Sequence, residues 1–114
     1  MKISEISTLL SAEVLCGKEM VDSEVHSACG SDMMSDVLAY VKDQAVLLTG
    51  LVNPQVVRTA EMMDMRCIVF VRNKKPSAEM IELATDASIV LMNTELRMFE
   101  ACGLLYSNGL RPNC

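Results

Sequence analysis

The sequence predicts a three-layer α/β/α sandwich with a mostly parallel sheet of about five strands. Short apolar runs rich in β-branched residues alternate with segments in which apolar residues recur at helical spacing. Parallel strands require crossover connections of about this length, and right-handed crossovers place helices on both faces of the sheet. A chain of 114 residues corresponds to one domain, which we place at residues 1–110, with 111–114 as a mobile tail.

The first part of the chain is expected to hold a helix, two strands and a second helix. The strands are expected at 12–16 (AEVLC) and 23–29 (SEVHSAC). The second helix follows the stretch CGSDMMSD and shows apolar residues at positions i, i+3, i+4 and i+7, which indicates one buried face. The residues expected to point inward are Ile3, Ile6, Leu10, Val25, Ala28, Met34, Val37, Leu38 and Val41.

Three more strands, each followed by a helix, are expected in the rest of the chain. The strands are placed at 45–50, 66–72 and 88–93, of which the first is a continuous apolar run typical of a strand covered on both faces. Asn53-Pro54 has the form of an N-cap followed by proline at the first helical position, and Thr94 is expected to cap the last helix. The inward residues of these helices are expected to be Val56, Ala60, Met63, Met80, Leu83, Ala84, Ala87, Met98, Ala101, Cys102 and Leu105.

Charge and hydropathy exclude several classes of function. The net charge is −5 and the basic residues are scattered, so a nucleic-acid-binding surface is not expected. The longest apolar runs are far too short to span a membrane, and the N-terminal stretch does not resemble a secretory signal. We therefore expect a cytoplasmic protein without a membrane-spanning segment.

The five cysteines do not form a recognisable metal or disulfide pattern. An odd number of cysteines without C-x-x-C spacing argues against a disulfide framework. His26 is the one histidine and has no partner at metal-ligand spacing. We expect no cofactor and no structural metal.

Polar residues follow the expected strands at the positions where ligands bind in open parallel sheets. Such ligands lie beyond the carboxyl ends of the strands, near helix N-termini that can hold an anion. No P-loop and no G-x-G-x-x-G fingerprint is present, so no phosphate motif specifies the ligand. The same residues can also serve as helix caps or solvated loops. The candidate ligand-binding residues are Ser31, Asp32, Thr49, Asn53, Arg72, Asn73 and Thr94.

Cys29 is the candidate reactive thiol. It precedes an expected helix, and a helix N-terminus lowers the pKa of a thiol. Covalent catalysis also needs a base and an orienting group, and the sequence places His26 on the opposite side of the strand. No residue is therefore assigned a catalytic role, and we expect the protein not to be an enzyme.

Five stretches resemble, in order and spacing, the DRTGG domain family. They are LLSAEVLCG, SACGSDMMSDVLAYV, VLLTGLVNPQVVRTAEM, IVFVRNKKPSAEMIELA and IVLMNTELRMFEACGLL, and together they run from about Ile3 to Gly109. The resemblance implies a sandwich like the N-terminal domain of HPr kinase/phosphorylase. By this alignment the Asp-Arg pair of the family falls at Leu51 and Val52, and its Thr-Gly-Gly falls at Val71, Arg72 and Asn73.

The resemblance also implies a role. Family members accompany paired CBS domains in some pyrophosphatases and occur in some phosphotransacetylases, where they are regulatory or dimer-forming modules. Free-standing members of this length look like those found in iron-hydrogenase gene clusters. We therefore expect a non-catalytic homodimeric module that binds a protein partner, or a small anion or nucleotide at the carboxyl edge of its sheet. The alternative is a redox or iron–sulfur accessory protein that uses Cys29 in a hydrogenase context.

Overall fold

Six strands form a single sheet in the computed structural model of the protein, which describes residues 1–40 and 44–112. The strands lie in the order β1-β5-β4-β3-β2-β6, and all neighbouring pairs are parallel except β1 with β5. Along the chain the elements are α1 (Ile3–Leu10), β1 (Glu13–Cys16), a 3₁₀ turn (Lys18–Met20), β2 (Ser27–Gly30), α2 (Met34–Tyr40), β3 (Ala45–Thr49), α3 (Pro54–Met62), β4 (Cys67–Phe70), α4 (Ala78–Asp86), β5 (Val90–Asn93), α5 (Met98–Ser107) and β6 (Arg111–Pro112).

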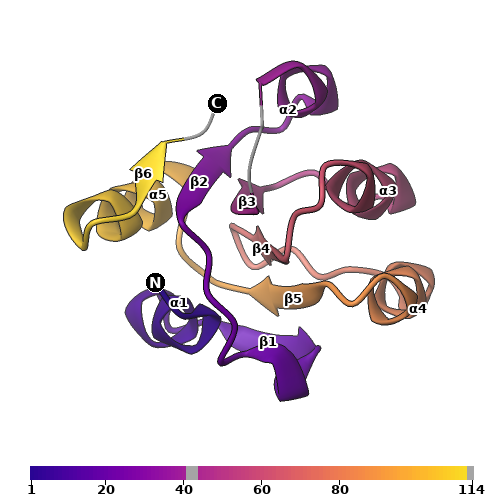
Figure 1. Cartoon of the computed structure of the whole chain (residues 1–114), viewed down its shortest axis with the longest axis horizontal. Coiled ribbons are helices and arrows are strands. Elements are labelled where there is room, and N and C mark those ends of the chain that lie inside the picture. The colour runs from indigo at the N-terminus through magenta and orange to yellow at the C-terminus, as the bar shows by residue number, and fades with distance from the viewer. Residues whose placement is uncertain (41–43, 113–114) are drawn as a thin grey trace.

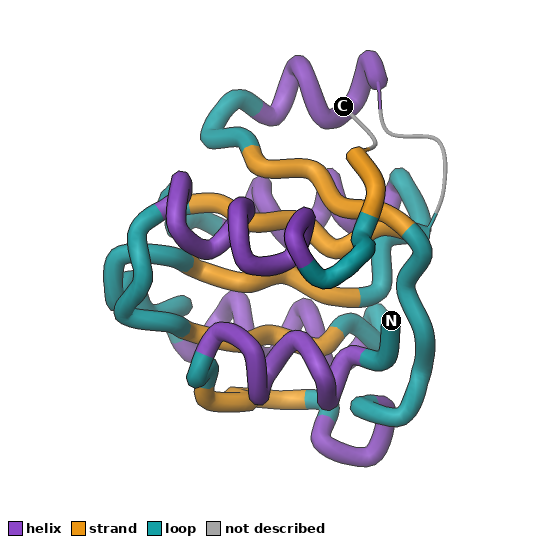
Figure 2. Tube along the Cα trace, turned by 90° about the vertical axis from the view of Figure 1, so that its left-hand side faces the viewer, coloured by secondary structure: helices purple, strands orange, loops and turns teal. Residues whose placement is uncertain are grey.

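Helices cover both faces of this sheet. Figure 1 shows α2, α3 and α4 on one face and α1 and α5 on the other. In Figure 2 the strands lie behind the α1–α5 layer. The three-layer α/β/α class with a mostly parallel sheet is therefore confirmed, with six strands where about five were expected.

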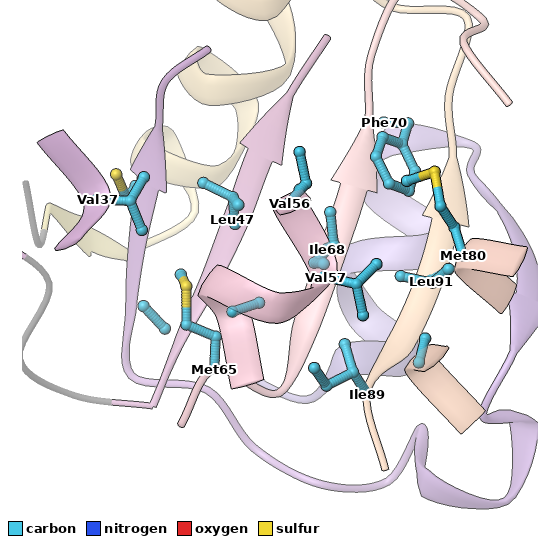
Figure 3. Packing of buried hydrophobic residues seen from close by; sticks show 14 residues of the cluster. Val37, Leu47, Val56, Val57, Met65, Ile68, Phe70, Met80, Ile89 and Leu91 are labelled. Atoms are coloured by element: carbon cyan, nitrogen blue, oxygen red, sulfur yellow. The ribbon is translucent and has the colours of Figure 1, made fainter. Parts of the chain in front are cut away.

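Each face of the sheet buries its own apolar core. The core under α2–α4 contains Val37, Leu47, Ile68, Phe70 and Leu91 among its buried side chains (Figure 3). The other core joins α1 and α5 to side chains of the alternate strand positions. Every residue of β3, β4 and β5 is buried, as expected for central strands covered on both faces.

The expected cap at the start of α3 is confirmed. The Asn53 side chain accepts a hydrogen bond from the Val56 N–H at 3.3 Å, and Pro54 occupies the first helical position. Proline is tolerated there because the N–H that it lacks would have no helical partner. Ser77 caps α4 in the same way, through a hydrogen bond from the Met80 N–H at 3.2 Å.

Several local expectations are wrong. Leu38 was placed on the buried face of α2, but it is 42% exposed; Val41, the last residue of that stripe, lies outside the described residues. The second strand begins at Ser27 and not at residue 23. Arg111 and Pro112, placed in a mobile tail, pair with Ser27 and Ala28 as strand β6, while 113–114 are not described.

Candidate functional site

The carboxyl ends of four parallel strands meet at one edge of the sheet. The register aligns Gly30 of β2 with Leu48 of β3, and Thr49 with Phe70 of β4, which in turn aligns with Asn93 of β5. The loops that follow these strands therefore lie side by side, as predicted from the sequence. They contain all seven candidate ligand-binding residues or border on them.

Asp32 connects the loop after β2 to the end of β3. Its Oδ1 atom accepts hydrogen bonds from Thr49 Oγ1 at 3.0 Å and from the Gly50 N–H at 2.7 Å. Thr49 is fully buried, and its hydroxyl oxygen also accepts from the Leu51 N–H at 3.1 Å. These bonds hold the Asp32 carboxylate in one orientation, with Oδ2 toward Arg72.

The Arg72 side chain lies directly over Gly50. A Cβ atom added to Gly50 would collide with the Arg72 guanidinium, so the glycine makes room for it. Arg72 Nη2 is 4.0 Å from Asp32 Oδ2, and about half of each side chain is exposed (49% and 52%). An ion pair this long and this exposed contributes little to stability, and the exposed guanidinium retains donors that can bind an anion.

Arg72 and Asn73 both adopt the left-handed backbone conformation. Their φ angles are 58° and 56°. Their N–H groups donate to the carbonyl oxygens of Leu96 and Thr94, at 2.8 Å in each case. The loop after β4 is thereby tied to the loop after β5. The two side chains lie at different places: that of Arg72 lies over Gly50, after β3, whereas Asn73 lines a hollow beside β5.

Three other candidate residues use their side chains in hydrogen bonds to the backbone. Ser31 Oγ accepts from the Met33 N–H at 3.0 Å, and Asn53 caps α3. Thr94 is 1% exposed and donates its hydroxyl proton to the Leu10 carbonyl at 2.7 Å. The expectation that Thr94 caps the last helix is wrong, because α5 begins only at Met98, and the Thr94 hydroxyl instead accepts from the Leu96 N–H.

Cys29, the candidate reactive thiol, lies inside the core under α2–α4. It is 1% exposed, and its sulfur is disulfide-bonded, whereas Cys16, Cys67 and Cys102 are free. Cys29 is therefore not the free thiol that was expected, and a disulfide is present at this residue although the odd number of cysteines argued against a disulfide framework. Burial raises the pKa of Cys67 and of Cys102, so both remain protonated and pack as small side chains.

The described residues contain no group of three or more His, Cys, Asp or Glu side chains that could hold a metal ion. In the same part of the chain, no helix has the length and apolar character needed to cross a bilayer.

Comparison with known proteins identifies the family. The model described as "DRTGG domain" matches residues 5–107. The chain belongs to the DRTGG domain family. This confirms the resemblance noted in the sequence, and no curated protein matches the chain.

A solved structure has the same fold. It is the crystal structure of the CBS and DRTGG domains of the regulatory region of Clostridium perfringens pyrophosphatase, complexed with its activator, diadenosine tetraphosphate. The TM-score is 0.75 at 19% sequence identity, over 91% of this chain and 45% of that one. This DRTGG chain thus spans less than half the length of its neighbour, and the likeness is one of fold.

The left-handed pair at 72 and 73 gives a physical reason for the DRTGG glycines. By the sequence alignment the Gly-Gly of the family falls at these two positions, and glycine adopts positive φ without steric penalty. This chain keeps the conformation but carries arginine and asparagine there. Asparagine tolerates the left-handed region, whereas for arginine it is strained. Arg72 therefore places a charged side chain at the edge where a glycine would place none.

Sequence reasoning missed one residue at this edge of the sheet, Glu13. Glu13 lies beside Asn93 because β1 runs antiparallel to β5, which brings the start of β1 to the carboxyl end of its neighbour. If β1 ran parallel to β5, Glu13 would lie at the opposite edge of the sheet. Gly50 was also not among the candidates, since a glycine has no side chain chemistry and its role depends on Arg72.

Proposed function

We propose that this DRTGG domain is a non-catalytic regulatory module that binds a small anionic ligand at the carboxyl edge of its sheet. The observation that carries the proposal is the exposed Arg72 guanidinium seated on Gly50 and held near Asp32. Arginine presents a planar set of donors that matches carboxylate and phosphate oxygens. The pyrophosphatase regulatory region that shares this fold binds a nucleotide activator, which supports a phosphate-bearing ligand as the first class to test.

The exchange of partners at Arg72 suggests how such a ligand would act. An incoming anion would replace the exposed Asp32 carboxylate at the guanidinium. Asp32 also receives hydrogen bonds from Thr49 and Gly50, and Arg72 is bonded through its N–H to the loop after β5. Ligand binding at this point would therefore change contacts among the loops that follow β2, β3, β4 and β5, and this is the basis for a regulatory signal.

The test is a binding measurement with three anions. Isothermal titration calorimetry would use pyrophosphate, ATP and diadenosine tetraphosphate against the wild type and Arg72→Ala. We expect at least one anion to bind and Arg72→Ala to weaken it by about tenfold or more, because a hydrogen bond to a charged group contributes about 1.5–3 kcal/mol. Arg58→Ala, which removes an exposed arginine from α3, is the matched control and should bind as the wild type does.

Unchanged affinity in Arg72→Ala would remove that residue from the site. Absence of binding by all three anions to the wild type would reject the anion-binding role and leave protein binding as the function to pursue.

We also propose that the domain forms a homodimer through the outer face of α5. Phe99 and Tyr106 are 90% and 59% exposed, and Gly103 lies between them at helical spacing with no neighbouring atom near its Cβ position. A glycine between two exposed rings allows a second helix to approach closely, and large exposed apolar groups mark interaction sites. Two copies of α5 in antiparallel orientation would set Phe99 of one chain against Tyr106 of the other.

Sedimentation equilibrium tests the dimer. The wild type and Met62→Glu should sediment as dimers, and Phe99→Glu should sediment as a monomer. Met62 is the matched control because it is an exposed apolar side chain, 70% exposed, on α3 at the opposite face of the sheet. A monomeric wild type, or a Phe99→Glu variant that remains dimeric, would contradict this interface.

A further inference from the structure

A polar hollow of about 330 Å³ lies at the carboxyl end of β5, next to the Arg72 site but distinct from it. One wall comes from the start of β1, where Glu13 pairs with Asn93 in the antiparallel register. The other wall comes from the loop after β4, which contributes Asn73 and Lys75. β5 lies between β1 and β4 in the sheet, so these two segments flank its carboxyl end.

The floor of the hollow is fixed by hydrogen bonds. Thr94, 1% exposed, donates its hydroxyl proton to the Leu10 carbonyl at 2.7 Å. Asn93, 6% exposed, donates from Nδ2 to the Lys74 carbonyl at 2.7 Å. A floor held in this way is formed before any ligand arrives, so little conformational freedom is lost on binding.

The Asn93 side chain presents an acceptor to the hollow. Among the described residues no N–H or O–H group donates to Asn93 Oδ1. Among the described residues, Thr59 Oγ1 is the fully buried side-chain polar atom that has no hydrogen-bond partner. Asn93 Oδ1 is therefore not fully buried. Because Nδ2 is held by Lys74, Oδ1 is the free end of a nearly buried amide that lines the hollow. Such an atom gains a hydrogen bond when a donor enters.

The charges around the rim have both signs. Glu13 and Glu95 supply carboxylates, and Lys75 supplies an ammonium group. A polyanion such as a nucleotide would meet two carboxylates here, and the repulsion between like charges would disfavour its binding. A ligand with an ammonium and a carboxylate meets an opposite charge at each end.

We propose that this hollow binds a compact zwitterion of the α-amino acid class. The ammonium group would donate to Asn93 Oδ1 and pair with Glu95 or Glu13, and the carboxylate would pair with Lys75. A volume of about 330 Å³ lies at the small end of the range for ligand sites, which suits a molecule of this size. Leu10 and Leu96 also line the hollow and offer apolar contact to a side chain.

The test is a titration of the ¹⁵N-labelled chain with each of the common L-amino acids, up to about 10 mM so that complexes with millimolar Kd are detected. The side-chain amide signals of Asn93 and the backbone N–H of Thr94 are the reporters. We expect a saturable shift of both with at least one amino acid. Lys75→Gln and the double variant Glu13→Gln/Glu95→Gln should each weaken that binding about tenfold, since each loses a charge-assisted hydrogen bond. Glu82→Gln, at an exposed position on α4, should bind as the wild type does.

Two results would overturn the proposal. One is the absence of a saturable shift with any of the amino acids. The other is a shift that neither Lys75→Gln nor Glu13→Gln/Glu95→Gln weakens, and loss of that shift in Arg72→Ala would place the binding at the Arg72 site. Arg72→Ala should leave amino acid binding unchanged, so the outcome does not depend on whether an anion binds at Arg72.

Discussion

Arg72 joins a strained backbone to an exposed charged side chain. A left-handed conformation costs an L-residue about 1–2 kcal/mol, and Arg72 adopts it at φ 58°. Strain of this kind persists where the surrounding structure enforces it, and such residues gather at functional sites. Here the enforcing contacts are the hydrogen bonds from the Arg72 and Asn73 N–H groups to the loop after β5.

We expect Arg72→Gly to raise the free energy of unfolding of the domain by about 0.5–1 kcal/mol, because glycine relieves the steric strain but loses more conformational entropy on folding. Arg72→Ala is the matched comparison, since it removes the guanidinium and keeps the strain. Urea denaturation of both variants checks this, and a glycine variant no more stable than the alanine variant would show that position 72 is not strained. Both variants should bind anions about tenfold more weakly or worse, which separates stability from function at this residue.

Cys67 predicts a loss of stability at alkaline pH. Burial raises the pKa of its thiol in the folded state, so the folded protein keeps the proton while the unfolded chain loses it above a pH of about 8.5. The free energy of unfolding therefore falls as the pH rises through that value, by about 1.4 kcal/mol per pH unit for one thiol. Denaturation of the wild type and Cys67→Ala from pH 7 to 10 measures the difference. If the free energy of unfolding of the two proteins changed equally with pH above about 8.5, the raised pKa of Cys67 would be contradicted.

At the scale of the elements, local sequence predicts what local physics determines. The buried runs that form β3 and β4, and the Asn53-Pro54 start of α3, depend on neighbouring residues and were predicted. The direction of β1 and the pairing of β6 depend on contacts between distant segments. Thr94 was misassigned because its buried hydroxyl bonds to Leu10, 84 residues away, a partner that no local pattern indicates.

Substitution of Asn53, at the start of α3, tests whether this residue belongs to the ligand site. Its side chain caps the helix, so Asn53→Ala should lower the free energy of unfolding by about 1 kcal/mol and leave pyrophosphate affinity unchanged. Gln55→Ala, exposed in the same helical turn, should alter neither quantity. Weaker anion binding by Asn53→Ala, beyond that of the Gln55 variant, would place Asn53 in the site after all.

At the scale of the whole molecule, the parallel sheet brings separate loops together at one edge. The location of the candidate site was predictable because the carboxyl ends of parallel strands share an edge. Its composition was only partly predictable: Asp32, Thr49 and Arg72 form one connected cluster with Gly50, whereas Ser31 and Asn53 serve their own loops. Glu13 joined the edge only through the antiparallel strand.

Two sites at one edge of a DRTGG domain would give it two inputs. The Arg72 cluster and the hollow beside β5 share the loop after β4, which contributes Arg72 to one and Asn73 and Lys75 to the other. Occupation of either site would act on the same strained segment. Coupling between sites is reciprocal in binding free energy, so any effect of one ligand on the affinity of the other can be measured from either side.

The measurement that tests the central claim most directly is a titration of the ¹⁵N-labelled domain with pyrophosphate. The backbone N–H of Gly50, which donates to Asp32, and that of Arg72 are the reporters. Anion binding at this edge predicts a saturable shift of both signals that requires about tenfold more anion, or more still, in Arg72→Ala. If neither signal moves with pyrophosphate, ATP or diadenosine tetraphosphate, or if both move equally in the variant, no anion binds at Arg72 and the proposed function is wrong.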